Sequence, residues 1–168
     1  MAARATSRAI DRSSHTRFMR RAIALARRGM NARDGGPFGA VVARGGVIVG
    51  EGWNRVVATR DPTAHGEIVA IRAACRRLAS FRLSGAVLYT TGEPCPMCLA
   101  AAYWARIDRI FYGFTIGDAA RIGFDDRVFF RELARPAGRR AVPAVQLLAA
   151  EARRLVREYA ALPRHTKY

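Results

Sequence analysis

The stretch TTGEPCPMCLAAAYWAR, residues 90–106, places two of the chain's three cysteines three residues apart, at positions 95 and 98. We expect residues 95–106 to form a helix, so that Cys95 and Cys98 share one face of its first turn. Free backbone N–H groups and the positive end of the helix dipole favour thiolates there. The pair is compatible with a redox couple, part of a disulfide framework or two ligands of a metal.

The number of cysteines and the amino terminus bear on that choice. Three is an odd number, and residues 1–17 lack the continuous apolar core of a secretory signal. No apolar run reaches the roughly 18 residues that a membrane span needs. We therefore expect free thiols, a cytoplasmic location and no membrane partner. Cys75 lies on the apolar stripe of its expected helix and is interpreted as a core residue.

The charge of the chain is strongly positive, with a formal net charge of +16 over 168 residues. Nearly all of it is arginine, since Lys167 is the only lysine, and the arginines are scattered without an aromatic-interleaved stripe. A positive charge attracts nucleic acid, but this scattered distribution disfavours nucleic acid as the partner. The composition is that of one globular domain, which we expect at residues 16–168 after a flexible extension of residues 1–15.

Hydrophobic periodicity predicts strands that alternate with helices after an opening helix and hairpin. This order indicates an α/β fold with a mixed sheet covered by helices on both faces. The expected elements are a helix at 15–31, a hairpin at 38–53, a helix at 61–80, a strand at 86–91, a helix at 95–106, a strand at 107–114, a short helix at 125–133, a strand at 144–150 and a helix at 151–162.

A histidine and a glutamate lie upstream of the cysteine pair, in the segment TAHGE. His65 and Glu67 fall at the start of their expected helix, and together with Cys95 and Cys98 they match the H-x-E…P-C-x-x-C signature of zinc deaminases. Three protein ligands leave one zinc position open for water, as in a catalytic site. Glu67 can then move the proton of that water. We therefore expect one Zn²⁺ per chain.

Further stretches resemble one known family. NARDGGPFGAVV, EGWNRV, DPTAHGEIVAIRAAC, GFDD and the terminal KY are similar to the cytidine-deaminase superfamily, and within it to the small bacterial zinc-dependent guanine deaminases. The resemblance implies a three-layer α/β/α fold with a five-stranded mixed sheet. It also implies a homodimer that exchanges its C-terminal segments and a conversion of guanine to xanthine and ammonia, in which activated water attacks C2.

The resemblance also assigns roles to individual side chains. Those for zinc and proton transfer are His65, Cys95 and Cys98 as ligands and Glu67 as the proton shuttle. For the substrate, the resemblance implies that Asn54 binds the purine edge and that Phe38 and Trp104 wall the pocket. It implies that Asp126 and Tyr168, from the exchanged part of the chain, read guanine and close the site. Structural alternatives stay open for Asn54 as a turn residue, for the two aromatics as core, and for Asp126 as a helix N-cap.

Two glycines depart from the family pattern. Gly66 stands where the family usually has alanine, so we expect a wider pocket and a looser first helical turn, which leaves substrate identity open. Gly92 is a second small departure, to which the sequence assigns no effect. The alternative functions are deamination of a guanine nucleoside, an aminotriazine or a pterin-like ring, deamination of tRNA adenosine, and a non-catalytic zinc-containing module that binds nucleic acid.

Overall fold

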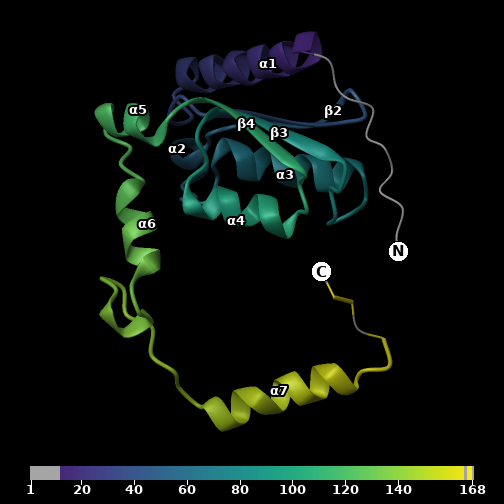
Figure 1. The fold of residues 1–168 in the computed structure, drawn as a ribbon, viewed down its shortest axis with the longest axis vertical. Helices are drawn as coiled ribbons and strands as arrows, with labels where there is room; N and C mark the ends of the chain where they lie inside the picture. Colours follow the sequence, from purple (N-terminus) through teal and green to yellow (C-terminus); the bar gives the residue numbers. More distant parts are fainter. Residues whose placement is uncertain (1–11, 165, 168) are drawn as a thin grey trace. The chain divides into compact units, whose positions relative to one another are not determined.

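The computed structural model describes residues 12–164 and 166–167, and its ribbon is shown in Figure 1. The expectations for residues 1–11 and for Tyr168 lie outside the described residues. The chain divides into two compact units, residues 1–126 and residues 127–168. No helix among the described residues is long and apolar enough to cross a membrane.

The first unit is built on a four-stranded mixed sheet in the order β2-β1-β3-β4. Its strands are β1 (Gly39–Arg44), β2 (Val47–Trp53), β3 (Ala86–Gly92) and β4 (Arg109–Phe114). β1 pairs antiparallel with β2 and β3, whereas β3 pairs parallel with β4. The predicted hairpin is confirmed, and its turn uses Gly45 and Gly46 with φ of 57° and 80°, which glycine adopts without a steric penalty.

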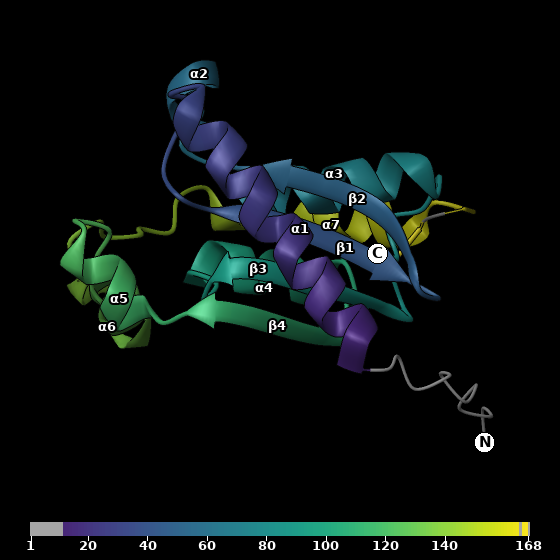
Figure 2. The ribbon, with the colours of Figure 1, turned by 90° about the horizontal axis from the view of Figure 1, so that it is seen from above.

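Helices cover both faces of this sheet, which gives the three-layer arrangement (Figure 1, Figure 2). α1 (Arg12–Asn31) packs on one face, and α3 (Gly66–Arg77) and α4 (Pro96–Trp104) pack on the other. Two short helices, α2 (Val56–Thr59) and α5 (Ile116–Arg121), were not expected from the sequence. Parallel pairing of β3 with β4 through α4 places the start of α4 at the carboxyl end of β3.

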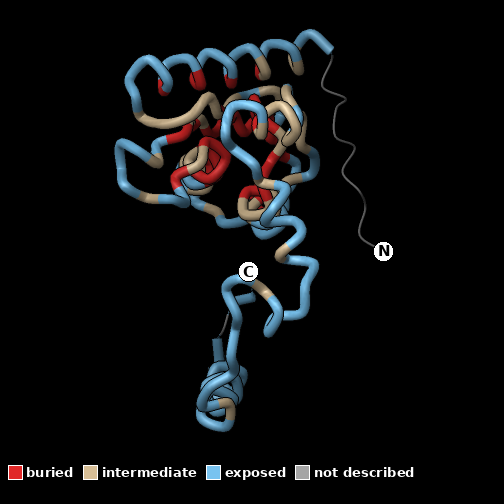
Figure 3. The backbone as a smooth tube through the Cα atoms, turned by 90° about the vertical axis from the view of Figure 1, so that its left-hand side faces the viewer, coloured by how far each residue is buried: buried red, intermediate tan, exposed pale blue. Residues whose placement is uncertain are grey.

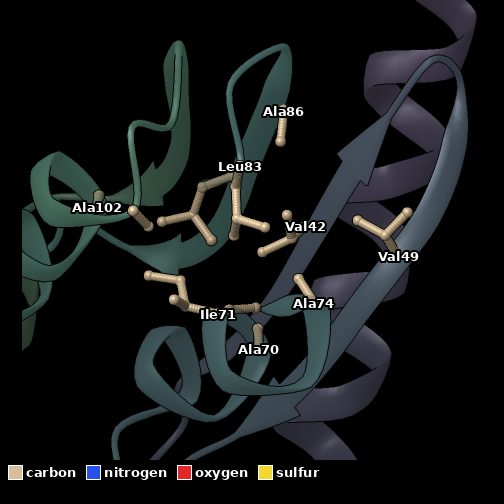
Figure 4. Close-up of a cluster of buried hydrophobic side chains, with 11 residues drawn as sticks. Val42, Val49, Ala70, Ile71, Ala74, Leu83, Ala86 and Ala102 are labelled. Carbon is tan, nitrogen blue, oxygen red and sulfur yellow. The ribbon is translucent and has the colours of Figure 1, made fainter. Parts of the chain in front are cut away.

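The buried residues lie in this first unit (Figure 3). Beneath α3 and α4, small and branched side chains such as Val42, Ile71 and Leu83 interlock in one cluster (Figure 4). Beneath α1, the ring of Tyr89 is fully buried and its hydroxyl lies 2.7 Å from Nδ1 of His15. His15 belongs to the stretch assigned to a flexible extension, but it lies in the first turns of α1.

The second unit differs from the expectation in two elements, an additional 3₁₀ turn and a missing strand. It contains α6 (Arg127–Ala134), a short 3₁₀ turn η1 (Ala137–Arg139) and α7 (Ala149–Ala161), and the predicted strand at 144–150 is absent. The described sheet therefore has four strands and not five. A strand requires a neighbour for its N–H and C=O groups, and this segment has none within its own unit.

Candidate metal centre and active site

Two helix starts bring the predicted metal ligands together. His65 is the last extended residue before α3, and Cys95 is the last before α4. Pro96 occupies the first helical position of α4, where its missing N–H removes no hydrogen bond and its fixed φ fits the helix. Cys98 follows in the first turn, fully buried, so that both sulfurs point toward the imidazole.

The geometry of the three groups fits a zinc ion. Nδ1 of His65 lies 3.7 Å from Sγ of Cys95 and 3.5 Å from Sγ of Cys98. The three possible ligand atoms all lie within 4.8 Å of one another. Zn–S and Zn–N bonds of about 2.3 and 2.0 Å at the tetrahedral angle would separate sulfur and nitrogen by about 3.5 Å. Two thiolates and one imidazole are also the donor set that zinc prefers.

The electrostatics of the cluster favour a bound cation. A hydrogen bond from Cys98 lowers the pKa of Cys95 to about 4, with a further contribution from His65. The same bond and burial raise the pKa of Cys98. The hydrogen bond with Cys95 raises the pKa of His65. The lowered pKa of Cys95 favours the thiolate form that a cation binds, and cation binding at Cys98 would release the proton of its thiol.

Glu67 lies beside the cluster in the first turn of α3, with only 4% of its surface exposed. Burial is the main reason that its pKa is raised, and the charge of His65 acts in the opposite direction. A buried carboxyl with a raised pKa next to a metal site can take a proton from water and return it at neutral pH. In the sequence, the match to the zinc-deaminase signature predicted this role for Glu67.

Asn54 and Asp126 occupy positions that suit both of their sequence interpretations. Asn54 is buried, and its Oδ1 accepts a hydrogen bond from Val56 N at 3.2 Å, so it does stabilise a turn. Asp126 directly precedes α6, where an N-cap residue would lie. Burial and the negative charge of Cys95 raise the pKa of Asp126, so its carboxyl lies within electrostatic range of the cluster.

The two predicted aromatic walls, Phe38 and Trp104, differ in how far they are buried. Phe38 is half-buried and packs against the rings of Phe114 and Phe124. Trp104 ends α4 and is 61% exposed. Sequence reasoning singled out neither Phe114 nor Phe124. The sequence signal that could have pointed to Phe124 is its adjacency to the acidic pair in GFDD.

The sequence suggested that Gly66 widens the pocket, whereas in the structure Gly66 faces the main chain of Phe38. A Cβ at this position would lie 2.9 Å from the carbonyl oxygen of Phe38, so it would press on main chain. That main chain is held in place, because Asn54 N donates to the same oxygen at 2.7 Å. The missing methyl group therefore acts through the position of the Phe38 main chain.

A cavity of about 330 Å³ lies elsewhere, between α1 and the end of β4. Its lining includes Ile23, Met30 and Phe114 but none of the clustered ligands. α1 packs on the sheet face opposite to α3 and α4, so this cavity is separate from the metal centre.

Comparison with known proteins identifies the family of the chain. Residues 12–114 match the model of the cytidine and deoxycytidylate deaminase zinc-binding region. The chain belongs to this family. Zinc is accordingly the cofactor of this deaminase, and the cluster of one histidine and two cysteines is the group of described residues that could hold it.

Individual deaminases of the family are closely similar. A guanine deaminase of Bacillus subtilis (strain 168) is 48% identical over 138 residues, which cover 82% of this chain and 88% of the relative. The X-ray structure of guanine deaminase from Bacillus subtilis matches with a TM-score of 0.89 and 44% identity, over 92% of this chain and 98% of that one. A tRNA-specific adenosine deaminase of Agrobacterium fabrum is 46% identical over 101 residues, 60% of this chain and 66% of the relative.

Replacing Gly66 by alanine tests how the glycine acts in this deaminase. We expect G66A to retain zinc but to lower kcat/KM by about tenfold, because Phe38 must move to relieve a contact with rigid main chain. Gain of helix propensity, up to about 1 kcal/mol, would be offset by that strain. Steady-state kinetics and thermal unfolding measure both effects.

The matched control is Gly117→Ala in α5, where a Cβ would meet only an ordinary contact at 3.6 Å. The prediction would be contradicted if G66A had the kinetics of the wild type and gained as much stability as the control. The close contact with Phe38 would then have no consequence.

Proposed function

We propose that this deaminase converts guanine and water to xanthine and ammonia. The observation that carries the choice of substrate is the 48% identity to a guanine deaminase over 82% of this chain. The geometry supports the type of reaction independently. A buried carboxyl beside a histidine–dicysteine cluster is suited to hydrolysis at a ring carbon that carries an amino group.

In the proposed mechanism, His65, Cys95 and Cys98 hold the metal. When bound there, zinc supplies a Lewis acid that makes water nucleophilic near neutral pH. Glu67 takes a proton from the attacking water and delivers it to N3 of guanine as the C–O bond forms at C2. It then transfers the second proton to the amino group, which leaves as ammonia when the C–N bond breaks.

The proposed substrate contacts follow from the chemistry of the guanine edge. Because Oδ1 of Asn54 already accepts a backbone hydrogen bond, Asn54 would use its amide NH₂ to donate to the acceptors of the purine. The carboxylate of Asp126 would accept from the donors on the opposite edge. Phe38, Trp104 and Tyr168 remain proposed walls of the site. Gly66 contributes by leaving room for the main chain of Phe38, which Asn54 N holds in place.

Asp126→Asn tests the proposed reading of guanine. Asparagine replaces one of the two acceptor oxygens by an NH₂ group, which would face a donor of the substrate, so we expect kcat/KM for guanine to fall about 10- to 100-fold. Zinc content should stay the same, since Asp126 is not a ligand. Ammonia release at several guanine concentrations measures the effect. Unchanged kinetics would show that Asp126 does not bind guanine and would favour its alternative interpretation as a helix N-cap.

A second candidate function is deamination of adenosine in tRNA. The similarity to a tRNA-specific adenosine deaminase favours it, but that match covers 60% of this chain against 82% for the guanine deaminase. The two are separated by adding an anticodon stem-loop to the ammonia assay at low and high salt, because contacts to RNA phosphates weaken steeply with salt.

We also propose that the second unit packs on another copy of the chain. None of its described residues is buried, and large apolar side chains are exposed along it, including Phe129, Val145 and Leu155. Exchange of this unit between two copies would cover those side chains, and residues 144–150 of the partner would then supply a fifth strand. Such surfaces are otherwise aggregation-prone.

Light scattering during size-exclusion chromatography tests this assembly. We expect a dimer for the wild type and a monomer, or soluble aggregates, for Leu155→Glu. A monomeric wild-type protein would contradict the exchange.

A cytoplasmic location also remains a proposal. It is supported by the absence of disulfide bonds at Cys75, Cys95 and Cys98.

A further inference from the structure

The loop that carries Asp126 is held by an aromatic contact outside the metal cluster. Gly123 has a φ of 95°, in the left-handed region that glycine favours, and Phe124 N donates to Ala119 O at 3.1 Å. The chain therefore turns back sharply after α5. The ring of Phe124 then meets that of Phe38 edge to face, with centroids 5.1 Å apart and planes at 87°. Asp126 follows two residues later.

Phe38 provides a fixed platform for this contact. The hydroxyl of Thr91 donates to Pro37 O at 2.9 Å and accepts from Gly39 N at 3.0 Å, so it holds the main chain on both sides of Phe38. The ring of Phe38 packs on that of Phe114, with centroids 5.7 Å apart. The contact with Phe124 is thus tied to β1, β3 and β4.

Glycines leave the space that these three rings fill. A Cβ on Gly92 would lie 2.7 Å from the ring of Phe114 and 3.2 Å from that of Phe38. A Cβ on Gly36 would lie 2.8 Å from Phe38 and 2.9 Å from Phe124. Gly92, to which the sequence assigned no effect, therefore allows the aromatic cluster of Phe38, Phe114 and Phe124 to assemble.

The other end of α5 is tied to the segment that precedes the metal ligands. Oε2 of Glu93 accepts a hydrogen bond from Ile116 N at 3.1 Å, and Glu93 N donates to Phe114 O at 2.9 Å. Glu93 lies two residues before Cys95. The segment that leads to Asp126 is therefore anchored at its start by Glu93 and near its end by Phe124.

We propose that Phe124 is a positioning residue that holds the carboxylate of Asp126 at the distance from the metal cluster that guanine requires. Phe124 remains 41% exposed, so its ring contributes less to the core than the buried aromatics do. Asp126 nevertheless lies close enough to Cys95 and His65 for their charges to act on its carboxyl. This inference rests on the proposed function, in which Asp126 reads the substrate.

The test compares Phe124→Ala with wild type on guanine and on 2-aminopurine, which lacks the N–H donor at N1. Misplacement of a recognition group by about 1 Å can lower activity up to about 100-fold, so we expect kcat/KM for guanine to fall 10- to 100-fold, mainly through KM. Activity on 2-aminopurine should change far less, so discrimination between the two rings should collapse. Zinc content and unfolding temperature should stay near wild type.

Matched variants separate positioning from general packing. Phe124→Tyr keeps the aromatic ring and should restore discrimination. Phe81→Ala removes a ring that is similarly exposed, 49%, in a loop outside the site and should leave both substrates unaffected. The double variant F124A/D126N should be no slower on guanine than D126N alone, because the two residues act through one contact.

The outcomes distinguish this inference from the proposed function. If wild type deaminates guanine and D126N is impaired while F124A is normal, the positioning role is wrong and the function stands. Equal losses on both rings in F124A, or a lowered unfolding temperature, would show a structural role and overturn the inference. If wild type does not act on guanine, the proposed function fails and the inference falls with it.

Discussion

Replacing Glu67 by glutamine is expected to abolish turnover, with kcat lowered by about 10³- to 10⁴-fold. Glutamine keeps the size and hydrogen-bonding outline of the side chain but cannot carry a proton. Glu67 is buried, and its pKa is raised mainly by that burial, so it is the described group best suited to exchange protons beside the cluster. Ammonia release from guanine by the zinc-loaded variant measures the effect.

Zinc content and thermal stability of E67Q should match the wild type, because Glu67 is not one of the clustered ligands. The matched control is Glu51→Gln, which only breaks a surface ion pair with Arg21 and should keep full activity. Substantial turnover by E67Q would mean that another group moves the proton.

Replacing Cys98 by serine is expected to remove bound zinc and activity together. A serine hydroxyl does not ionise near neutral pH, whereas zinc binds the thiolate, so we expect affinity to weaken by more than about 100-fold. Cys98 is fully buried, so solvent does not reach the position of its sulfur to replace the lost ligand. The unfolding temperature should also cease to respond to added zinc. Metal analysis and calorimetry test both points.

Cys75→Ser is the matched control for this experiment. Cys75 is a free thiol on α3, outside the cluster and packed against the core. Its replacement should leave zinc content and kcat unchanged, with at most a modest loss of stability. One equivalent of tightly bound zinc in C98S would contradict the assignment of the ligands.

The metal cluster could be predicted from the sequence because local signals determine each part of it. His65 and Cys95 are both placed by helix starts, and Pro96 specifies the start of α4. The spacing of Cys95 and Cys98 then places both sulfurs on one helical face. Only the meeting of the two helix starts depends on the sheet between them.

Features that depend on contacts between distant segments could not be predicted in this way. The strand predicted at 144–150 shows the right composition but has no neighbour within its own unit. The direction of a Cβ at Gly66 matters because Phe38, far away in sequence, presents its carbonyl oxygen there. The role of Gly92 likewise becomes apparent only when Phe114 is placed above it.

His15 illustrates the same limit at the amino terminus. The sequence placed His15 in a flexible extension, yet its ring packs on that of Phe111 with centroids 4.5 Å apart, and its Nδ1 lies within hydrogen-bond distance of the hydroxyl of Tyr89. Both partners lie on strands more than 70 residues away. Sequence periodicity does not report such contacts.

The most direct test of the account is to incubate zinc-loaded wild-type protein separately with guanine, guanosine, adenine, cytosine, cytidine and an aminotriazine. Ammonia and the ring product are measured in each reaction. We predict that guanine reacts fastest and yields one xanthine for each ammonia released. Inert guanine beside rapid turnover of another ring would contradict the substrate assignment, and no turnover of any ring would contradict the proposed function itself.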